Sequence, residues 1–451
     1  MKAVKVIVVI VAVLAALVIV LVGAGIYFTN RYLQTPAFKQ QALQTARGEL
    51  GANVEINELQ VSLFSGVVLR GVVISSPQGF SGNLLTADAF VLRYRLLPLL
   101  HRRVEIEQLS IDKPIITLAQ NDKNEWNYEK IGAPEAQPKP TPMASPQATP
   151  RESAKPVPLD VVLSKLAITQ GALSMVDDSN KPIVKVDGID FSSSVSLIDN
   201  QLAGTGKAGI DKIDLSEKLF VENVTTVVEL GSNQVKLTSL RGELADGKIS
   251  GDVSVSFGTG LEYIVSAQLT NSDVGKLLQE AGAKQAMSGT LNVSTTMQGT
   301  GGVPTIVGSG RVNIDNGKLM QIPLLNLLAT ALQIDALRDL TFRQCLVEFS
   351  ISNNVMQMPV IRLTSPQIQI TGKGSVALDT HRLNHDMTIT FAKGVFDNAL
   401  LPQIRDLFTE QQDGSLTLDF KVTGPYNSPK TDLTKRLGQQ LLQKGLQQLF
   451  K

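Results

Sequence analysis

Hydrophobic residues form one long uninterrupted run near the amino terminus and follow a different pattern elsewhere. Residues 6–28 are 23 consecutive apolar residues. As a helix with a rise of ~1.5 Å per residue, they extend over ~34 Å, enough to cross the ~30 Å hydrocarbon layer of a bilayer. Tyr27, Phe28 and Tyr32, which suit the membrane interface, follow in place of a small-residue cleavage site. The pattern predicts an uncleaved transmembrane anchor in residues 1–30.

Beyond the anchor, apolar residues recur at every second position. Val253, Val255 and Phe257 alternate with serines. This period of two is typical of half-buried antiparallel strands, which have one apolar and one polar face. The same alternation recurs at Met387, Ile389 and Phe391, and at Leu416, Leu418 and Phe420.

Helical patterns are few, and they are too short to cover a sheet of roughly twenty strands. The apolar face of such a sheet must be closed by a second sheet, by curling of the sheet, or by a ligand. The predicted fold is mainly β: a transmembrane helix followed by an elongated antiparallel β-sheet with a few short helices. The predicted helices are residues 36–48, 272–286 with Ser272 as N-cap, 323–337, 395–408 and the segment from about 433.

Proline marks one domain boundary. Residues 133–158 hold eight of the 20 prolines, a density that favours an extended, unpacked linker. The linker separates a helix-plus-sheet module, residues 31–132, from a β-rich module, residues 159–432.

The last segment, residues 433–451, has an amphipathic helical pattern. Its basic residues fit an interfacial helix on anionic lipid, and a helix that caps the end of the sheet fits equally well. The candidate membrane-interface residues are Leu441, Leu442, Leu446, Leu449 and Phe450.

Composition and motifs argue against nucleic acid, a metal cofactor and catalysis. The net charge is +1, which gives no general attraction to nucleic acid. His381 and His385 would converge on a metal only in a helix, and they lie in a predicted hairpin. Asp177 and Asp178 read as an acidic turn, with a calcium site as the alternative. Cys345 is the single cysteine, and no phosphate-binding loop or nucleophile pair is present. We therefore predict a protein that is not an enzyme and has no cofactor.

Five segments along the chain have a recognisable order: residues 109–118, 121–127, 271–278, 315–328 and 424–430. Taken in this order, they resemble the AsmA family of membrane-anchored envelope proteins. The chain departs from the family pattern where Lys123 and Asn124 replace a glycine, and where Trp126 precedes Asn127 although the family has Asn before Trp. The resemblance implies a curled, groove-like sheet with an apolar groove, similar to that of bridge-like lipid-transfer proteins, and a role in phospholipid traffic and outer-membrane integrity.

The expected function is phospholipid transfer or outer-membrane assembly by an inner-membrane protein. Short basic tails such as the one with Lys2 and Lys5 normally stay in the cytoplasm, so residues 31–451 are expected in the periplasm. We expect an envelope protein partner or a homo-oligomer to complete the route of the lipid across the envelope. The alternative is a membrane-tethered β-sandwich scaffold that binds envelope proteins without carrying lipid. The lipid-facing candidates are Val253, Val255, Phe257, Met387, Ile389, Phe391, Leu416, Leu418 and Phe420.

Overall fold

The computed structural model describes most of the chain between residues 36 and 436. The anchor predicted in residues 1–30, the linker 133–158 and the membrane-interface candidates Leu441 to Phe450 lie outside the described residues. No helix within the described ranges combines the length and the hydropathy that a membrane-spanning segment requires. The described residues are 36–62, 66–95, 103–131, 160–199, 201–257, 261–284, 286–300, 303–320, 322, 325–326, 329, 337–395, 407–433 and 435–436.

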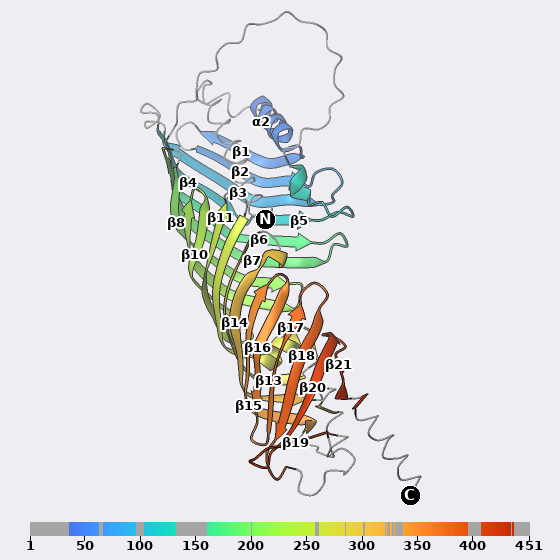
Figure 1. The fold of residues 1–451 in the computed structure, drawn as a ribbon. Coiled ribbons are helices and arrows are strands. Elements are labelled where there is room, and N and C mark those ends of the chain that lie inside the picture. Colours follow the sequence, from blue (N-terminus) through green and yellow to red (C-terminus); the bar gives the residue numbers. More distant parts are fainter. Residues whose placement is uncertain are drawn as a thin grey trace, which may run out of the picture. The chain divides into compact units, whose positions relative to one another are not determined.

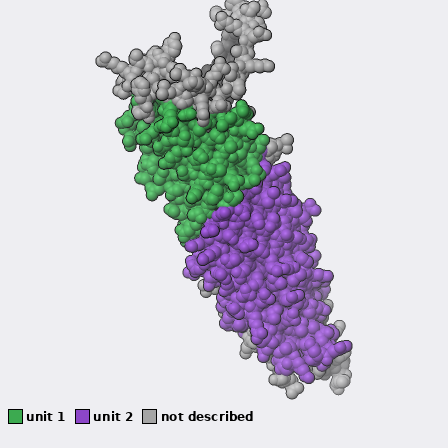
Figure 2. All heavy atoms as spheres, turned by 90° about the vertical axis from the view of Figure 1, so that its left-hand side faces the viewer, with its two compact units in different colours: residues 1–238 green, residues 239–451 purple. Residues whose placement is uncertain are grey.

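The described strands belong to one sheet of 21 strands. Neighbouring strands pair antiparallel, except that β6 pairs parallel with β4 and β5. The predicted class, mainly β with one long antiparallel sheet and few helices, is therefore confirmed. The chain divides into two compact units, residues 1–238 (unit 1) and 239–451 (unit 2) (Figure 2).

The described part of unit 1 starts with helix α2 and continues as a sheet, as the sequence predicts (Figure 1). After the β5 strand, a short 3-10 helix precedes the linker. The described elements of unit 1 are α2 (Pro36–Leu50), β1 (Val54–Ser62), β2 (Gly66–Ser75), β3 (Asn83–Arg95), β4 (Arg103–Asp112), β5 (Ile115–Ala119), η2 (Asn127–Lys130), β6 (Asp160–Val176), β7 (Pro182–Ile198), β8 (Gln201–Leu215) and β9 (Leu219–Gly231). The boundary between the two units falls within β10 (Gln234–Leu244).

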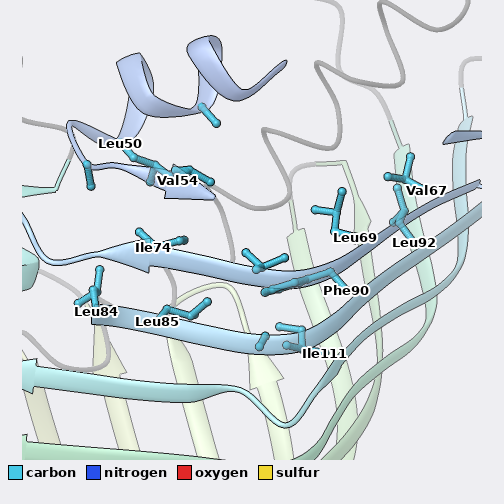
Figure 3. Packing of buried hydrophobic residues seen from close by; sticks show 14 of the residues in the cluster. Leu50, Val54, Val67, Leu69, Ile74, Leu84, Leu85, Phe90, Leu92 and Ile111 are labelled. Carbon is cyan, nitrogen blue, oxygen red and sulfur yellow. The ribbon is translucent and has the colours of Figure 1, made fainter. Parts of the chain in front are cut away.

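A closed core lies where α2 packs over the first strands. Ala46 and Leu50 of α2 are 2% and 5% exposed, and they belong to a cluster with buried residues of β1 to β4 (Figure 3). Two basic side chains of α2 also bond to the backbone of β1. Arg47 donates to the Val54 carbonyl at 2.9 Å, and Lys39 Nζ donates to the Asn57 carbonyl at 2.9 Å. The first strand is thus tied to its helix by packing and by hydrogen bonds.

Unit 2 is a meander in which most strands pair with the next strand in sequence. Near the last strands of unit 2, two side chains form hydrogen bonds with the backbone of β20. Asp432 Oδ1 accepts from the Lys421 N–H at 2.8 Å, and Arg436 donates to the Asp419 carbonyl at 2.6 Å. The elements are β11 (Gly247–Phe257), β12 (Leu261–Asp273), α3 (Val274–Glu280), β13 (Met287–Thr300), η3 (Val303–Thr305), β14 (Val307–Met320), β15 (Asp339–Ser352), β16 (Val355–Thr364), β17 (Ile368–Ala377), β18 (Arg382–Phe391), β19 (Thr409–Glu410), β20 (Leu416–Pro425) and β21 (Lys430–Thr431).

The helix predicted at residues 272–286 is shorter than expected. α3 ends at Glu280, and its N-cap is Asp273, whose Oδ1 accepts from the Lys276 N–H at 2.7 Å. Ser272, the predicted N-cap, is fully buried in β12 and donates to the Leu244 carbonyl at 2.9 Å. A carboxylate caps a helix as well as a hydroxyl does, so the neighbouring residue took the role. Most of the helices predicted at 323–337 and 395–408 lies outside the described residues.

Left-handed residues occur within the long strands, and those at Gln170 and Asn271 coincide with β-bulges. Gln170, Ser239 and Asn271 have φ of 50°, 54° and 57°. Each backbone N–H is held by a side-chain oxygen on the next strand, from Asp190, Asp252 and Asn292 respectively, at 2.9 to 3.0 Å. β-Bulges increase the right-handed twist and bend a strand locally. The aspartate and asparagine side chains therefore stabilise the curvature of the sheet.

Replacing Asp252 with alanine is expected to destabilise unit 2 by about 1 kcal/mol, because the Ser239 N–H loses its acceptor. Asp252→Asn keeps an acceptor oxygen and should restore most of the stability, as Asn292 does at the equivalent bulge. The measurement is the urea midpoint of the full chain. Ser250→Ala, on the same exposed face of β11, is the control. Equal midpoints for Asp252→Ala and the control would contradict the role assigned to this side chain.

Candidate functional site: a partly covered apolar face

A continuous row of aliphatic side chains crosses unit 2 from strand to strand. Each member is the register partner of the next, from β11 to β16. All are half-buried, whereas residues beneath a second layer would be buried. The row, named here the central row, is Ile249, Leu269, Val293, Val312, Val347 and Ile361.

The same face closes at the last strands of unit 2. The central row continues through Gly372 and Met387 to Phe420, which is 5% exposed. Phe420 belongs to a packed cluster in which Ile389 and Phe391 are 0% exposed and the Phe391 and Phe408 rings meet edge to face at 5.9 Å. One end of the face is therefore an ordinary protein core, and the stretch before it is only half covered.

Unit 1 repeats this change from buried to half-buried along a row of its own. Leu69, Phe90 and Ile111 are register partners and are 3%, 5% and 6% exposed near α2. The row continues through Ile168 on β6 and Phe191 on β7, both of which are half-buried. Each unit, taken by itself, has a closed core and an adjoining apolar stretch that the described residues cover only in part.

Two hydroxyl groups, one on the apolar face of each unit, are hydrogen-bonded to the backbone. Ser193 Oγ donates to the Thr205 carbonyl at 3.0 Å, and Thr295 Oγ1 donates to the Ser309 carbonyl at 3.0 Å. Their donors are therefore satisfied within the sheet, and they do not make the face polar. His385 is a titratable group on the same face; it is 8% exposed, and burial lowers its pKa. The face is suited to apolar contact and offers little hydrogen bonding.

The predicted lipid-facing residues fall into two groups. Val253, Val255 and Phe257 are half-buried on β11, beside the central row, and Met387 and Leu416 are half-buried near the core cluster. The remaining four are packed within that cluster and have almost no surface left for a ligand in this structure. They are Ile389, Phe391, Leu418 and Phe420.

Sequence reasoning missed most of the central row. Leu269 is the last of several alternating apolar residues on β12, a pattern that was available. On β14, however, Gly308 and Gly310 occupy inward positions and interrupt the apolar period before Val312. The apolar alternation can therefore be recognised in the sequence of β12 but not in the sequence of β14.

Among the described residues, the side chains that could bind a metal are not grouped at one site. No group of three or more His, Cys, Asp or Glu residues that could hold a metal occurs among the described residues. His381 lies in the turn before β18 and contacts the Tyr426 ring at 5.5 Å, while His385 is within β18. The hairpin placement predicted for the two histidines is confirmed.

A pocket of about 480 Å³ opens at β17, β18 and β20 beside residues of the polar face. Its charged side chains largely neutralise each other: Lys421 pairs with Asp386 at 3.2 Å, and Arg436 pairs with Asp432 at 3.5 Å. These exposed pairs contribute little binding energy of their own. The apolar face is the stronger candidate for a ligand.

The alkylation rate of Cys345 measures how far the apolar face is shielded from solvent at this position. It lies between Ile314 and Leu363 in the register, and burial raises the pKa of its thiol. Because the thiolate is the reactive form, alkylation by iodoacetamide should be slow at pH 7 and should still accelerate above pH 9. The rate is measured against the same chain in urea. A native rate equal to the rate in urea would show that the thiol is not shielded.

Comparison with known proteins gives one match. The AsmA family model matches residues 1–208 and 193–361, which together exceed half of the chain. Neither a curated protein nor a solved structure matches this chain.

Proposed function

Because the chain belongs to the AsmA family, we propose that it is a membrane-anchored envelope protein whose apolar sheet face binds the acyl chains of phospholipids. Family membership suggests an envelope-associated function. The finer proposal is that bound phospholipid is transferred between membranes or delivered for outer-membrane assembly. It needs no catalytic residue and no cofactor.

The observation that supports this proposal is the half-buried central row. Six aliphatic side chains, contributed by six successive strands, form one apolar strip with little polar interruption. Burial of acyl methylenes against such a strip is worth roughly 0.8 kcal/mol each. A phospholipid presents many methylenes, so modest contacts along the strip sum to a useful affinity. The part of this face that the described residues leave exposed also lets a chain enter without unfolding the sheet.

The proposed location is the inner membrane, with the bulk of the chain in the periplasm. The apolar run 6–28 is long enough for one crossing, and the short tail before it carries Lys2 and Lys5. An envelope protein or a second copy is proposed to receive the lipid. This arrangement puts the apolar face next to a source of phospholipid.

The test is lipid carried by the full chain after gentle extraction. Phospholipid measured by mass spectrometry should exceed the amount retained by a control in which residues 1–35 precede an unrelated soluble domain. The control accounts for lipid around the anchor. Equal amounts in the two proteins, together with a stoichiometric protein partner on this chain, would replace the proposal with a tethered scaffold.

A further inference from the structure

A row of small residues lies on the apolar face of unit 2, next to the central row. Its members are successive register partners on β11, β12, β13 and β14, strands that follow one another in the sheet (Figure 1). On one side stand Leu269 and Val293 of the central row, and on the other stand Val265 and Met297. The small residues, named here the floor, are Gly251, Ala267, Thr295 and Gly310.

The floor favours one direction for a bound chain. Along β11 the inward positions alternate between large and small, from Ile249 through Gly251 to Val253. Across the strands, every floor position is small and the positions beside it are mostly large. An extended acyl chain that lies across the strands therefore fits over the small residues and between the larger side chains on either side. From β11 to β14 this path is ~14 Å long, at ~4.8 Å per strand spacing.

Phe349 occupies the next position after the floor. It is the register partner of Gly310, and a Cβ built on Gly310 would lie 2.4 Å from Phe349 Cζ. The aromatic ring therefore rests directly over the glycine. The β15–β16 register shifts between Glu348 and Ser350, so Phe349 sits at an irregularity where the regular ladder is interrupted. The Phe349 side chain is half-buried, so part of its surface remains exposed.

We propose that Phe349 is a specificity-determining residue that stops an acyl chain lying on the floor and so limits the chain length this face accepts. This inference rests on the proposed function. A chain that enters over Gly251 and Ala267 meets the Phe349 ring at Gly310. Without the ring, the path continues toward Met358 on β16, whose register partner Gly374 is again small.

The experiment uses the full chain and fatty acids of stepwise increasing length, each with a diazirine at the methyl end. In the native protein, affinity should stop rising once the chain reaches Phe349, and crosslinks from the longest probes should fall on β14 and β15. In Phe349→Ala, each further methylene should add roughly fourfold in affinity over the next few. Crosslinks should then extend to Met358.

Two further variants keep the result interpretable. Phe349→Leu retains apolar bulk and should preserve most of the limit. Tyr426→Ala removes an exposed aromatic residue in the turn after β20, outside the apolar face, and should leave the length dependence unchanged. Thermal unfolding of each variant checks that the chain is folded.

The outcomes separate this inference from the proposed function. Probes that crosslink to Val265 in the native protein but show the same length dependence in Phe349→Ala would overturn the role of Phe349 and leave lipid binding intact. No crosslink to the apolar face in any variant would overturn both.

Discussion

Ile389→Asp is expected to unfold unit 2. Ile389 is 0% exposed, and its register partners on either side are Ile370 and Leu418. An unpaired carboxylate at this position costs several kcal/mol, because the cluster that surrounds it consists of apolar side chains. That is a large share of the 5–15 kcal/mol that typically separates folded and unfolded domains. Thermal unfolding followed by circular dichroism, with limited proteolysis, measures the effect on the full chain.

Two other substitutions on β18 calibrate that result. Ile389→Val removes one methyl group and should cost about 1 kcal/mol. Asn384→Asp adds the same charge on the exposed face of the same strand and should leave the unfolding midpoint nearly unchanged. If Ile389→Asp melts at the native midpoint, the cluster around Ile389 is not the closed core described here.

Val312→Asp is expected to have the opposite effect: the fold survives and lipid binding is lost. Val312 lies in the central row, where it is half-buried, so a carboxylate there keeps contact with water and should cost about 1 kcal/mol or less. A bound acyl chain would have to desolvate that charge. Crosslinking of a diazirine-bearing phospholipid to the full chain should therefore fall tenfold or more.

The matched control for Val312→Asp is Ser309→Asp, an exposed position on the opposite face of β14. This variant should crosslink lipid as the native chain does. Unfolding of Val312→Asp to the extent expected for Ile389→Asp would mean that the central row is covered. Full lipid crosslinking by a folded Val312→Asp would remove the apolar face from the proposed function.

The contrast between half-buried and fully buried strand positions also marks the limit of sequence reasoning. Val255 and Ile389 sit in the same alternating pattern, and that pattern correctly places both in strands. Their exposure differs because residues distant in sequence cover only one of them. Leu325 and Leu337, which belong to the cluster with Ile389, precede it by more than fifty positions. Alternation gives the face of a strand and carries no information about what lies over that face.

Bulges set a second limit. Gln170 and Ser239 adopt left-handed backbone conformations although neither is glycine or asparagine, so composition did not mark them. Each depends on a carboxylate from a neighbouring strand, which is a tertiary contact. A bulge also changes which residues face inward, because the side-chain period is two. The strands were therefore predictable, and the continuous central row was not.

The turn that departs from the AsmA pattern shows a substitution that the fold accommodates. Asn124 adopts a φ of 59°, the left-handed conformation that the family's glycine provides without strain. Asn121 Oδ1 accepts from the backbone N–H groups of Lys123 and Glu125, each at 3.0 Å, and so holds the turn. Asn127 is 0% exposed and donates to the Thr117 carbonyl at 2.8 Å. The inverted order of Trp126 and Asn127 thus still yields an anchored turn.

The side chains that bond to the backbones of β1 and β20 bear on how copies of this protein meet. A strand added at Asn57 or Val54 would have to displace Lys39 and Arg47, and one added at Lys421 would have to displace Asp432. Exposed strand edges otherwise act as templates for pairing between molecules. Pairing between the strand edges of two copies is therefore disfavoured at these positions of β1 and β20.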